Sequence, residues 1–360
     1  MLELLEPLAA AARIDPPRDP RPIAVIGAGA IADFAHLPAY RAVGLPVRGI
    51  YDLKAERAAE VAERHGVGHV YGSAEEAFAD PEVGVVDIAV VPWAQPELVR
   101  AGIAAGKPML CQKPFALELP LARELTAEAE SAGVKIAVQQ QLRFDEGIAA
   151  AREIVRRGLI GEVTAVTFTV DIETDWSAWP WLVEAPRLEI MFHSIHYLDA
   201  IRSLLGNPVR VFCAASRTPG QRAVAETRTM STLLFEDGVR ALVHVNHENH
   251  VGDPKAEFRI DGSEGSVRGT LGLLYDYPHG RPDTLEFRSL SLPTDGWVPY
   301  PVTSRWLPDA FAGPMAALQE WIAGGPPAPT RLEDNLHTLA LVDALYRSVE
   351  TGEAQEVDRS

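Results

Sequence analysis

The chain has 360 residues, 47% of them hydrophobic, which is enough to bury the cores of two domains. Its 50 acidic and 33 basic residues give a formal net charge of −17, which disfavours nucleic acids and anionic membrane surfaces as partners. The two cysteines, Cys111 and Cys213, lack the spacing of a metal or redox motif, and no apolar run approaches the roughly 20 residues needed to cross a bilayer. Because the start of the chain lacks a signal-peptide pattern, we expect a cytoplasmic protein without a membrane partner.

The first part of the chain predicts a short helix, a linker and a parallel α/β domain. Residues 13–22 contain four prolines, which oppose helix continuation, so residues 1–20 are predicted to form an N-terminal extension. Strands are expected at 23–26, 46–51, 85–91, 109–111 and 135–139, with helices ending near residue 43 and at 54–65, 96–105 and 119–132. This alternation is typical of a parallel sheet with right-handed crossovers, and it predicts a nucleotide-binding Rossmann domain over residues 21–141.

The pattern changes after residue 141, where strands follow one another. Strands are expected at 162–171, 209–216, 227–235, 240–246, 257–261, 266–270 and 284–289, and helices at 145–157, 189–205, 310–323 and 332–351. Neighbouring strands of this kind predict a large, mainly antiparallel sheet. The expected fold class is therefore α/β plus α+β, with a second domain over residues 142–357.

The clearest motif is a glycine-rich turn after the first predicted strand. It reads Gly27-x-Gly29-x-x-Ala32 and opens a helix. This arrangement lets the backbone approach a pyrophosphate while unpaired N–H groups of the helix point toward it. We predict that Gly27, Gly29, Ala30 and Ile31 bind a dinucleotide; a tight strand-to-helix turn without a ligand is the alternative.

An acidic residue ends the second predicted strand. Asp52 lies about 20 residues after the glycine turn, where a carboxylate can accept hydrogen bonds from both hydroxyls of the adenosine ribose. A carboxylate there would repel a 2′-phosphate, which favours NAD, while the nearby Lys54 keeps NADP possible. The alternative role of Asp52 is the N-cap of the following helix.

Three later segments carry a resemblance to a known family. They are residues 105–116, which contain Lys113-Pro114, residues 157–162, and residues 196–206, which begin with His196. From about residue 23 to residue 357 the chain resembles the family named after glucose-fructose oxidoreductase, inositol dehydrogenase and rhizopine catabolism proteins (Gfo/Idh/MocA). The resemblance implies a Rossmann domain followed by an open antiparallel sheet that binds substrate and forms oligomers, which would be a homodimer or homotetramer.

The resemblance also implies NAD-linked oxidation of a carbinol on a sugar, inositol or related polyol. Lys113 matches the family's lysine that contacts both the nicotinamide side and the reacting hydroxyl, and His196 matches its catalytic histidine. Two positions depart from the family's pattern. Gln112 replaces a more frequent glutamate, and Phe192 stands where many polyol dehydrogenases have an aspartate that binds substrate.

The residue types themselves fit this chemistry. Hydride transfer occurs at the nicotinamide, so the protein has to position the carbinol and move the hydroxyl proton. An imidazole, with an unperturbed pKa of about 6.5, suits a general acid or base, and we assign that role to His196. Lys113, at the carboxyl end of a parallel strand, is expected to orient the hydroxyl and to stabilise the developing alkoxide; burial would lower its pKa.

Four further residues are candidates for substrate binding. Trp176 and Trp179 lie in a loop before the histidine helix, and indole faces stack on the apolar faces of sugars; domain packing is the alternative. His193 could bind the substrate hydroxyl that an aspartate at position 192 would bind, or it could simply pack on the helix face. Arg143 could reach substrate from the domain junction, where a structural ion pair is the alternative.

The spacing of His193, His196 and Asp199 places all three on one side of a helix. We predict no metal there, because two histidines three residues apart need further ligands and the family uses none.

The predicted function is an NAD-dependent dehydrogenase acting on a small sugar or polyol. Two alternatives are an NAD-dependent glycosidase that works by transient oxidation and a sensor that binds cofactor and ligand without catalysis.

Overall fold

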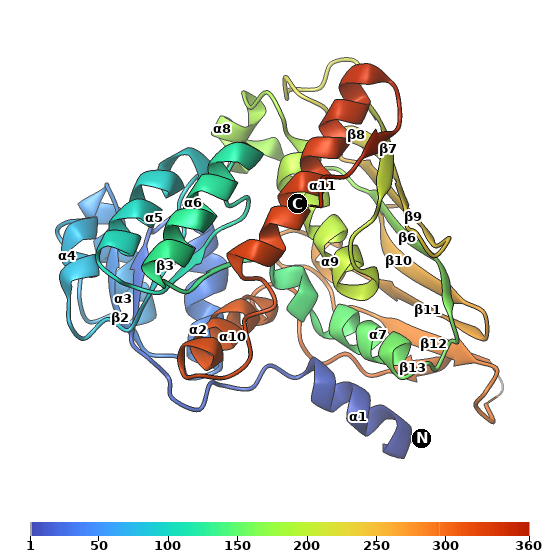
Figure 1. The fold of residues 1–360 in the computed structure, drawn as a ribbon, viewed down its shortest axis with the longest axis horizontal. Coiled ribbons are helices and arrows are strands. Elements are labelled where there is room, and N and C mark those ends of the chain that lie inside the picture. The colour runs from blue at the N-terminus through green and yellow to red at the C-terminus, as the bar shows by residue number, and fades with distance from the viewer. Residues whose placement is uncertain (1, 295, 360) are drawn as a thin grey trace. The chain divides into compact units, whose positions relative to one another are not determined.

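A computed structural model describes residues 2–294 and 296–359, and the chain divides into two compact units (Figure 1). The nucleotide unit consists of Ile14–Phe144 and Leu307–Leu336. The sheet unit consists of Met1–Arg13, Asp145–Trp306 and His337–Ser360. None of the described helices is both long and apolar enough to cross a membrane.

The nucleotide unit is built on a parallel sheet, as the sequence predicts. Its five strands are β1 (Ile23–Ile26), β2 (Val47–Tyr51), β3 (Val85–Ile88), β4 (Met109–Cys111) and β5 (Ile136–Val138), in the order β2-β1-β3-β4-β5. A parallel bridge between Ile50 and Val70 adds an extended segment outside β2. Because β2 lies on one side of β1 and β3 on the other, the strand order reverses between β1 and β3. Ligands of open parallel sheets bind beyond the carboxyl ends of the strands at such a reversal.

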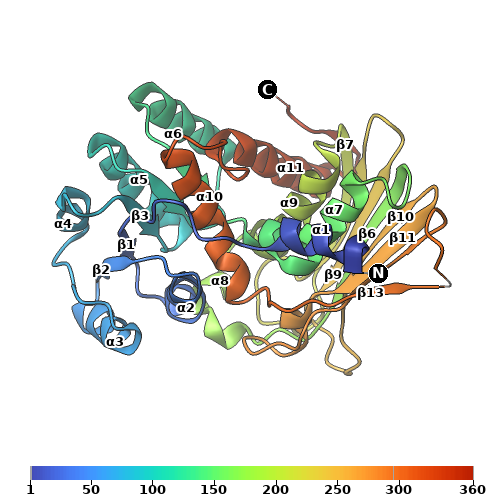
Figure 2. The same cartoon turned by 90° about the horizontal axis from the view of Figure 1, so that it is seen from below.

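Helices cover both faces of this sheet. Figure 2 shows α2 (Leu37–Ala42) and α3 (Ala55–His65) on one side, and α5 (Gln95–Ala104) and α6 (Leu119–Ala132) on the other. The sequence did not predict α4 (Ala74–Ala79), because six residues are too few to show a helical period.

The segment Leu307–Leu336 belongs with the nucleotide unit, which differs from an uninterrupted second domain over 142–357. Its helix α10 (Ala312–Ile322) packs against β4 and β5 of the parallel sheet. The backbone N–H of Arg21 donates to Gln319 Oε1 over 2.7 Å, and Lys135 Nζ donates to the backbone carbonyl of Trp321 over 2.6 Å. Such contacts join residues about 300 and 200 positions apart, so sequence order alone assigns the helix to the wrong domain.

The sheet unit contains a nine-stranded sheet within the described residues. The strands are β6 (Val163–Asp171), β7 (Arg210–Ser216), β8 (Arg228–Leu234), β9 (Arg240–Asn246), β10 (Lys255–Gly262), β11 (Gly265–Thr270), β12 (Leu285–Ser289), β13 (Val298–Tyr300) and β14 (Gln355–Glu356). Their order is β13-β12-β11-β10-β6-β9-β8-β7-β14. The expected antiparallel sheet is confirmed, with one parallel pair between β6 and β9. The two shortest strands, β13 and β14, were not predicted.

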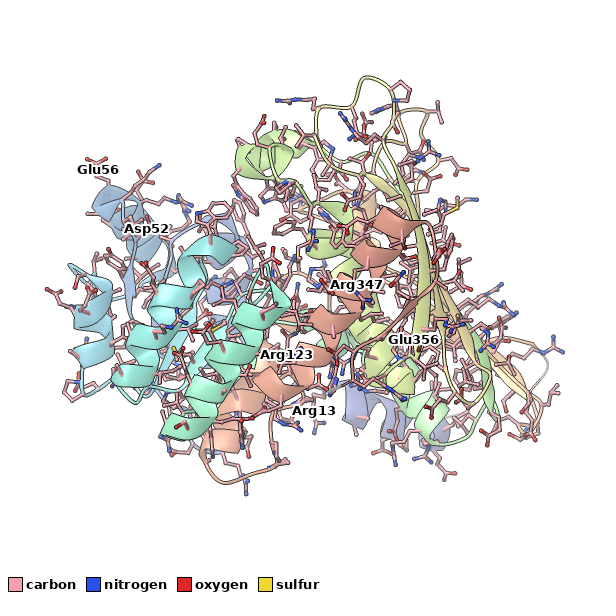
Figure 3. The ribbon with its side chains drawn as sticks, turned by 45° about the horizontal axis from the view of Figure 1, so that its top comes forward. Arg13, Asp52, Glu56, Arg123, Arg347 and Glu356 are labelled. Atoms are coloured by element: carbon pink, nitrogen blue, oxygen red, sulfur yellow. The ribbon has the colours of Figure 1, made fainter. Side chains whose placement is uncertain are left out.

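One face of this sheet is covered by helices. They include α1 (Leu2–Ala12), α7 (Glu146–Arg156), α9 (Ile195–Leu205) and the part of α11 (Leu332–Thr351) from His337 onward, with the short α8 (Pro180–Val183) in the loop before α9. Side chains alternate between buried and exposed along the strands, and Phe168 of β6 stacks on Tyr197 of α9 at 5.6 Å. Arg347, near the end of α11, donates to the backbone carbonyl of Glu356 in β14 over 3.0 Å and so ties the last strand to this helix (Figure 3).

The close packing of α10 leads to a stability prediction. A Cβ atom on Gly313 would overlap the ring and Cβ of Phe144, so Gly313→Ala should lower the free energy of unfolding by about 1 to 3 kcal/mol. Gly68→Ala is the control, because its Cβ would meet nothing within 4 Å. Denaturant unfolding measures both variants. Equal stability of the two would contradict this packing.

Candidate active site

The glycine turn lies at the end of β1 and fits a dinucleotide. Gly27 has a φ of +106°, and a Cβ there would lie 2.5 Å from the carbonyl oxygen of Ala89, so this position requires glycine. A Cβ on Gly29 would meet nothing within 4 Å, which leaves an open side for a pyrophosphate. Ala30 and Ile31 form the first turn of the helix that follows. The predicted binding residues are therefore gathered at one end of the sheet.

Asp52 holds the turn in place from the end of β2. Its Oδ2 accepts a hydrogen bond from the backbone N–H of Ala28 over 2.8 Å, and its Oδ1 accepts one from Lys54 over 2.9 Å. The N-cap of α3 is Lys54, so the capping role considered for Asp52 is wrong. Figure 3 shows Asp52 just before Glu56 at the start of α3. Each carboxylate oxygen keeps a second lone pair with which to accept a ribose hydroxyl.

A hollow of about 480 Å³ lies beside the turn. It is lined by Asp33, Phe34, Pro38, Arg57, Arg64 and His65. Arg57 donates to the carbonyl oxygen of Ala28 over 2.9 Å and forms an ion pair with Asp33 over 2.7 Å. Burial opposes the charge on Asp33, but hydrogen bonds from Arg64, His65 and Arg57 outweigh it and lower the pKa of that carboxyl. Arg57 thus joins α3 to the glycine turn, a role that its place in the sequence did not reveal.

Lys113 is the second residue after β4 and lies at the carboxyl edge of the same sheet. The residue is partly exposed, yet burial of its amine lowers its pKa to about 7. This agrees with the expected effect of burial. The side chain of the preceding Gln112 is buried, and its Oε1 accepts a hydrogen bond from the backbone N–H of Lys113 over 2.7 Å. At neutral pH such an amine can exist in both protonation states.

In the sheet unit, the predicted histidine helix begins as a π-helical turn over Ile190–Ser194 and continues as α9. His196 lies in the first turn of α9, is buried, and meets the ring of Trp306 edge-on at 5.4 Å. Phe192 is also buried and packs edge-on against Trp181 at 5.4 Å. An apolar side chain with an aromatic neighbour therefore stands where many polyol dehydrogenases have an aspartate.

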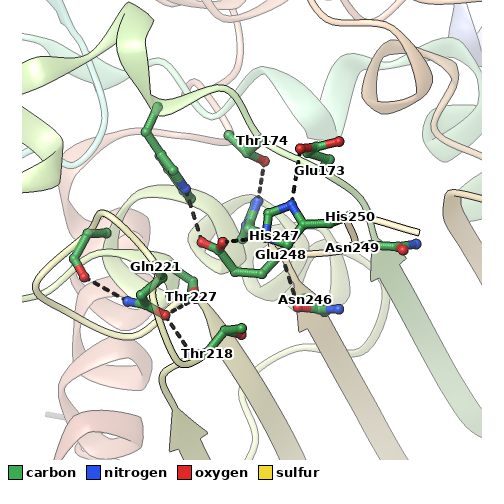
Figure 4. A network of polar contacts seen from close by, with 12 residues as sticks. Glu173, Thr174, Thr218, Gln221, Thr227, Asn246, His247, Glu248, Asn249 and His250 are labelled. Carbon is green, nitrogen blue, oxygen red and sulfur yellow. Dashed lines mark hydrogen bonds and ion pairs between the residues drawn. The ribbon is translucent and has the colours of Figure 1, made fainter. Parts of the chain in front are cut away.

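Trp176, His193 and His247 form an aromatic cluster. The two imidazole centroids are 4.5 Å apart, and the indole lies 5.6 Å from His193 and 5.3 Å from His247. Thr174 Oγ1 lies 2.7 Å from His247 Nδ1, and burial lowers the pKa of His247 to about 3 (Figure 4). The sequence pointed to the first two residues but not to His247, because that contact joins residues more than 50 positions apart.

The other candidates have identified partners. Arg143 donates to the carbonyl of Pro329 over 2.9 Å and pairs with Asp334 over 2.6 Å, which is the structural ion pair considered as its alternative role. Trp179 packs against Tyr277 at 5.3 Å. Asp199 accepts a hydrogen bond from Thr338 over 2.7 Å. Among the residues that the structure describes, no group of three or more histidine, cysteine or acidic side chains is arranged to hold a metal.

The candidate residues thus fall into two groups. Gly27, Gly29, Ala30, Ile31, Asp52, Lys113 and Arg143 belong to the nucleotide unit, and Trp176, Trp179, His193 and His196 belong to the sheet unit. The first group can hold a dinucleotide next to a titratable amine. The second combines an imidazole with aromatic faces.

Comparison with known proteins matches both parts of the chain. Residues 21–140 match a model described as an oxidoreductase family with an NAD-binding Rossmann fold, and residues 148–268 match the model of the GFO/IDH/MocA C-terminal domain. The chain is 31% identical to a D-apiose dehydrogenase of Paraburkholderia graminis over 93% of this chain and 89% of that one. It is 29% identical to a 1,5-anhydro-D-fructose reductase of Ensifer adhaerens over 93% and 98% of the two chains.

A solved structure gives the same picture. An oxidoreductase from Agrobacterium radiobacter, in complex with NAD+, L-tartaric acid and magnesium, superposes with a TM-score of 0.81 at 26% identity. The match covers 94% of this chain and 99% of that one.

Glu189, at the start of the histidine helix, makes the stability of the sheet unit sensitive to pH. Its Oε1 accepts a hydrogen bond from Ser194 over 2.7 Å and its Oε2 accepts one from Thr229 over 2.5 Å. Burial outweighs these hydrogen bonds and raises the pKa of Glu189 to about 7. A carboxyl group whose pKa is higher in the folded than in the unfolded protein loses stability as the pH rises between the two values.

We therefore expect Glu189→Gln to remove this pH dependence. Between pH 5 and pH 8, the free energy of unfolding of the wild type should fall by about 2 to 3 kcal/mol relative to the variant. Denaturant unfolding at several pH values measures the difference. Parallel pH profiles for the two proteins would show that Glu189 is ionised normally.

Proposed function

Because the chain belongs to the Gfo/Idh/MocA family of oxidoreductases, we propose that it is an NAD-dependent dehydrogenase oxidising a carbinol of a sugar, inositol or related polyol. The relatives named for D-apiose oxidation and 1,5-anhydro-D-fructose reduction support a sugar substrate. The observation that carries the proposal is the position of Lys113, two residues after β4 at the edge where the glycine turn lies, together with the lowered pKa of its amine, about 7. Both cysteines are free and buried, which supports a cytoplasmic location.

In this proposal, two side chains handle the proton of the reacting hydroxyl. NAD, which the glycine turn and Asp52 would hold, would supply the acceptor for the hydride of the carbinol carbon. Lys113 hydrogen-bonds the hydroxyl, and its charged form stabilises the developing alkoxide. His196 acts as the general acid or base, because an imidazole exchanges protons near neutral pH. Neither role requires a metal ion.

The aromatic cluster favours an uncharged substrate. We propose that Trp176 and His193 contact it, with Trp179 and Arg143 as further candidates. His247, with a pKa of about 3, is neutral at physiological pH and offers no positive charge to a carboxylate. Phe192 adds an apolar contact in place of an acidic one. A neutral sugar with an apolar face fits these side chains better than a sugar acid does.

The function is tested with a panel of D-apiose, other aldoses, inositols, sugar acids and aryl glycosides. We expect NADH to accumulate with one or more of the neutral sugars or polyols. The absorbance of the reduced cofactor measures this accumulation. Cleavage of a glycoside without net NADH formation would instead indicate the glycosidase. No reaction with any compound, together with tight NADH binding, would indicate the sensor.

The site assignment is tested by Lys113→Met and His196→Ala. Each should lower turnover by a factor on the order of 10² to 10⁴ while the affinity for NADH stays near that of the wild type, because neither change touches the glycine turn. Matched controls are Lys107→Met, whose amine bonds backbone carbonyls of the same unit, and His250→Ala, whose ring is exposed. Full activity in both site variants would refute the roles.

We further propose that the helix-free face of the nine-stranded sheet pairs with a second copy of the chain, giving a homodimer or a homotetramer. Phe212, Thr232 and Leu242 form a row across β7, β8 and β9, and Met230 lies on the same face. The three apolar members are 41% (Phe212), 41% (Leu242) and 54% (Met230) exposed. A contiguous apolar patch of this kind on a regular sheet is typical of an interface.

The double substitution Met230→Glu and Leu242→Glu should therefore dissociate the oligomer, because two buried carboxylates would face each other across the interface. Light scattering during gel filtration measures the mass. Val251→Glu, at a 96% exposed loop position, is the control and should keep the wild-type mass. A monomeric wild type at micromolar concentration would refute the interface.

A further inference from the structure

A chain of buried polar side chains connects the glycine-turn helix to Lys113 within the nucleotide unit. His36, at the end of the π-helical turn Ala32–His36, is fully buried, as is Asp87 in β3. His36 Nδ1 lies 2.7 Å from Asp87 Oδ2, and His36 Nε2 lies 3.1 Å from Gln112 Nε2. Gln112 Oε1 in turn accepts a hydrogen bond from the backbone N–H of Lys113. The contacts join residues from three separate segments.

The donors and acceptors in this chain fit only one arrangement of protons. Gln112 Oε1 accepts from Lys113, so the amide nitrogen of Gln112 faces His36 and donates to Nε2. Nδ1 must then carry the imidazole proton, which it donates to Asp87. Tyr40 donates to the same Asp87 oxygen over 2.8 Å. His36 is therefore a neutral imidazole of defined tautomer.

This network is maintained at a cost to stability. The second oxygen of Asp87 is buried and has no hydrogen-bond partner among the described residues. A buried polar atom without a partner is destabilising, so an apolar core at this place would be more stable. The ring of Phe311, 5.3 Å from that of His36, closes the network off from water. A role beyond packing is the simplest reason for such a costly arrangement.

We propose that His36, oriented by Asp87, is a positioning residue that fixes Gln112 and thereby the place of Lys113 at the carboxyl edge of the sheet. The π-helical turn that ends in His36 belongs to the helix that starts at the glycine turn, so one helix carries residues of the dinucleotide site and also the imidazole that contacts Gln112. The inference rests on the proposed function only in taking Lys113 as the reacting lysine.

The network also explains why this chain carries glutamine at position 112. A glutamate there would accept hydrogen bonds and donate none, so His36 would need protons on both nitrogens to pair with it and with Asp87. The exchange would place another carboxylate next to Lys113 and favour its charged form. A neutral glutamine therefore fits the neutral imidazole of His36, and it places no negative charge at position 112 beside the amine of Lys113.

The test measures the titration of Lys113 directly and needs no substrate. The full chain is acylated with acetic anhydride at a series of pH values, and modification of the Lys113 peptide is quantified by mass spectrometry. In the wild type, the midpoint should lie at about pH 7. If the loop at Lys113 loosens, water reaches the amine and the midpoint moves toward its ordinary value.

Two variants of His36 separate positioning from general stability. His36→Asn keeps a donor for Asp87 but loses the acceptor that faces Gln112, so we expect the midpoint to rise by at least about one pH unit, which is a tenfold loss of free amine. His36→Gln restores an acceptor at the position of Nε2 and should keep the wild-type midpoint. Thr126→Val removes an equally buried hydroxyl that bonds only its own helix and should also leave the midpoint unchanged.

Gln112→Met, which keeps the length of the side chain but removes the amide, provides a second route if His36→Asn does not fold. It should raise the midpoint in the same way. A wild-type midpoint in whichever of His36→Asn and Gln112→Met folds would overturn the inference. Failure of the proposed function would look different, since it would leave these midpoints as expected while the wild type oxidised no sugar or polyol.

Discussion

The arrangement of this protein depends on burial of one amine, that of Lys113, at the carboxyl edge of a parallel sheet. Desolvation alone accounts for its pKa of about 7, and the neighbouring Gln112 contributes no charge. The glycine turn lies at the same edge because β1 and β4 belong to one parallel sheet, and the absence of a side chain at Gly27 allows the turn to pack closely against Ala89. The fold thus brings a dinucleotide site and a titratable group together without any contribution from a substrate.

The sheet unit places aromatic rings next to its candidate substrate residues, and Trp176 also donates from its Nε1 to the carboxylate of Glu248 over 3.2 Å. Phe192 packs on Trp181, and His247 is buried as a neutral ring beside His193. The buried carboxyl at the start of the histidine helix, Glu189, has a raised pKa and hydrogen-bonds to hydroxyls. Aromatic faces beside hydrogen-bonding groups suit a neutral polyhydroxylated ligand, whose hydroxyls need hydrogen bonds and whose carbon face needs aromatic contact.

Much of the fold could be predicted from the sequence, because strand and helix periods are local properties. Both sheets, the glycine turn and most element boundaries follow from residue patterns within about ten positions. The missed elements, α4, β13 and β14, are too short to show a period. The place of α10 and the contact of His36 with Gln112 depend on residues brought together across long stretches of chain, which no local pattern encodes. Asp52 was predicted at the nucleotide site, but the hydrogen bond that it accepts from the backbone N–H of Ala28 was not.

Hydride transfer from a neutral sugar or polyol to NAD is the central claim, and isotope transfer tests it most directly. Wild-type protein is incubated with NAD+ and aldoses or inositols deuterated at every carbinol carbon, and the reduced cofactor is analysed by mass spectrometry. The account predicts one deuterium atom in each reduced cofactor molecule formed, and formation of the reduced cofactor slower by a factor on the order of 10² to 10⁴ in Lys113→Met. Reduced cofactor without deuterium, or no reduced cofactor with any labelled compound, would contradict it.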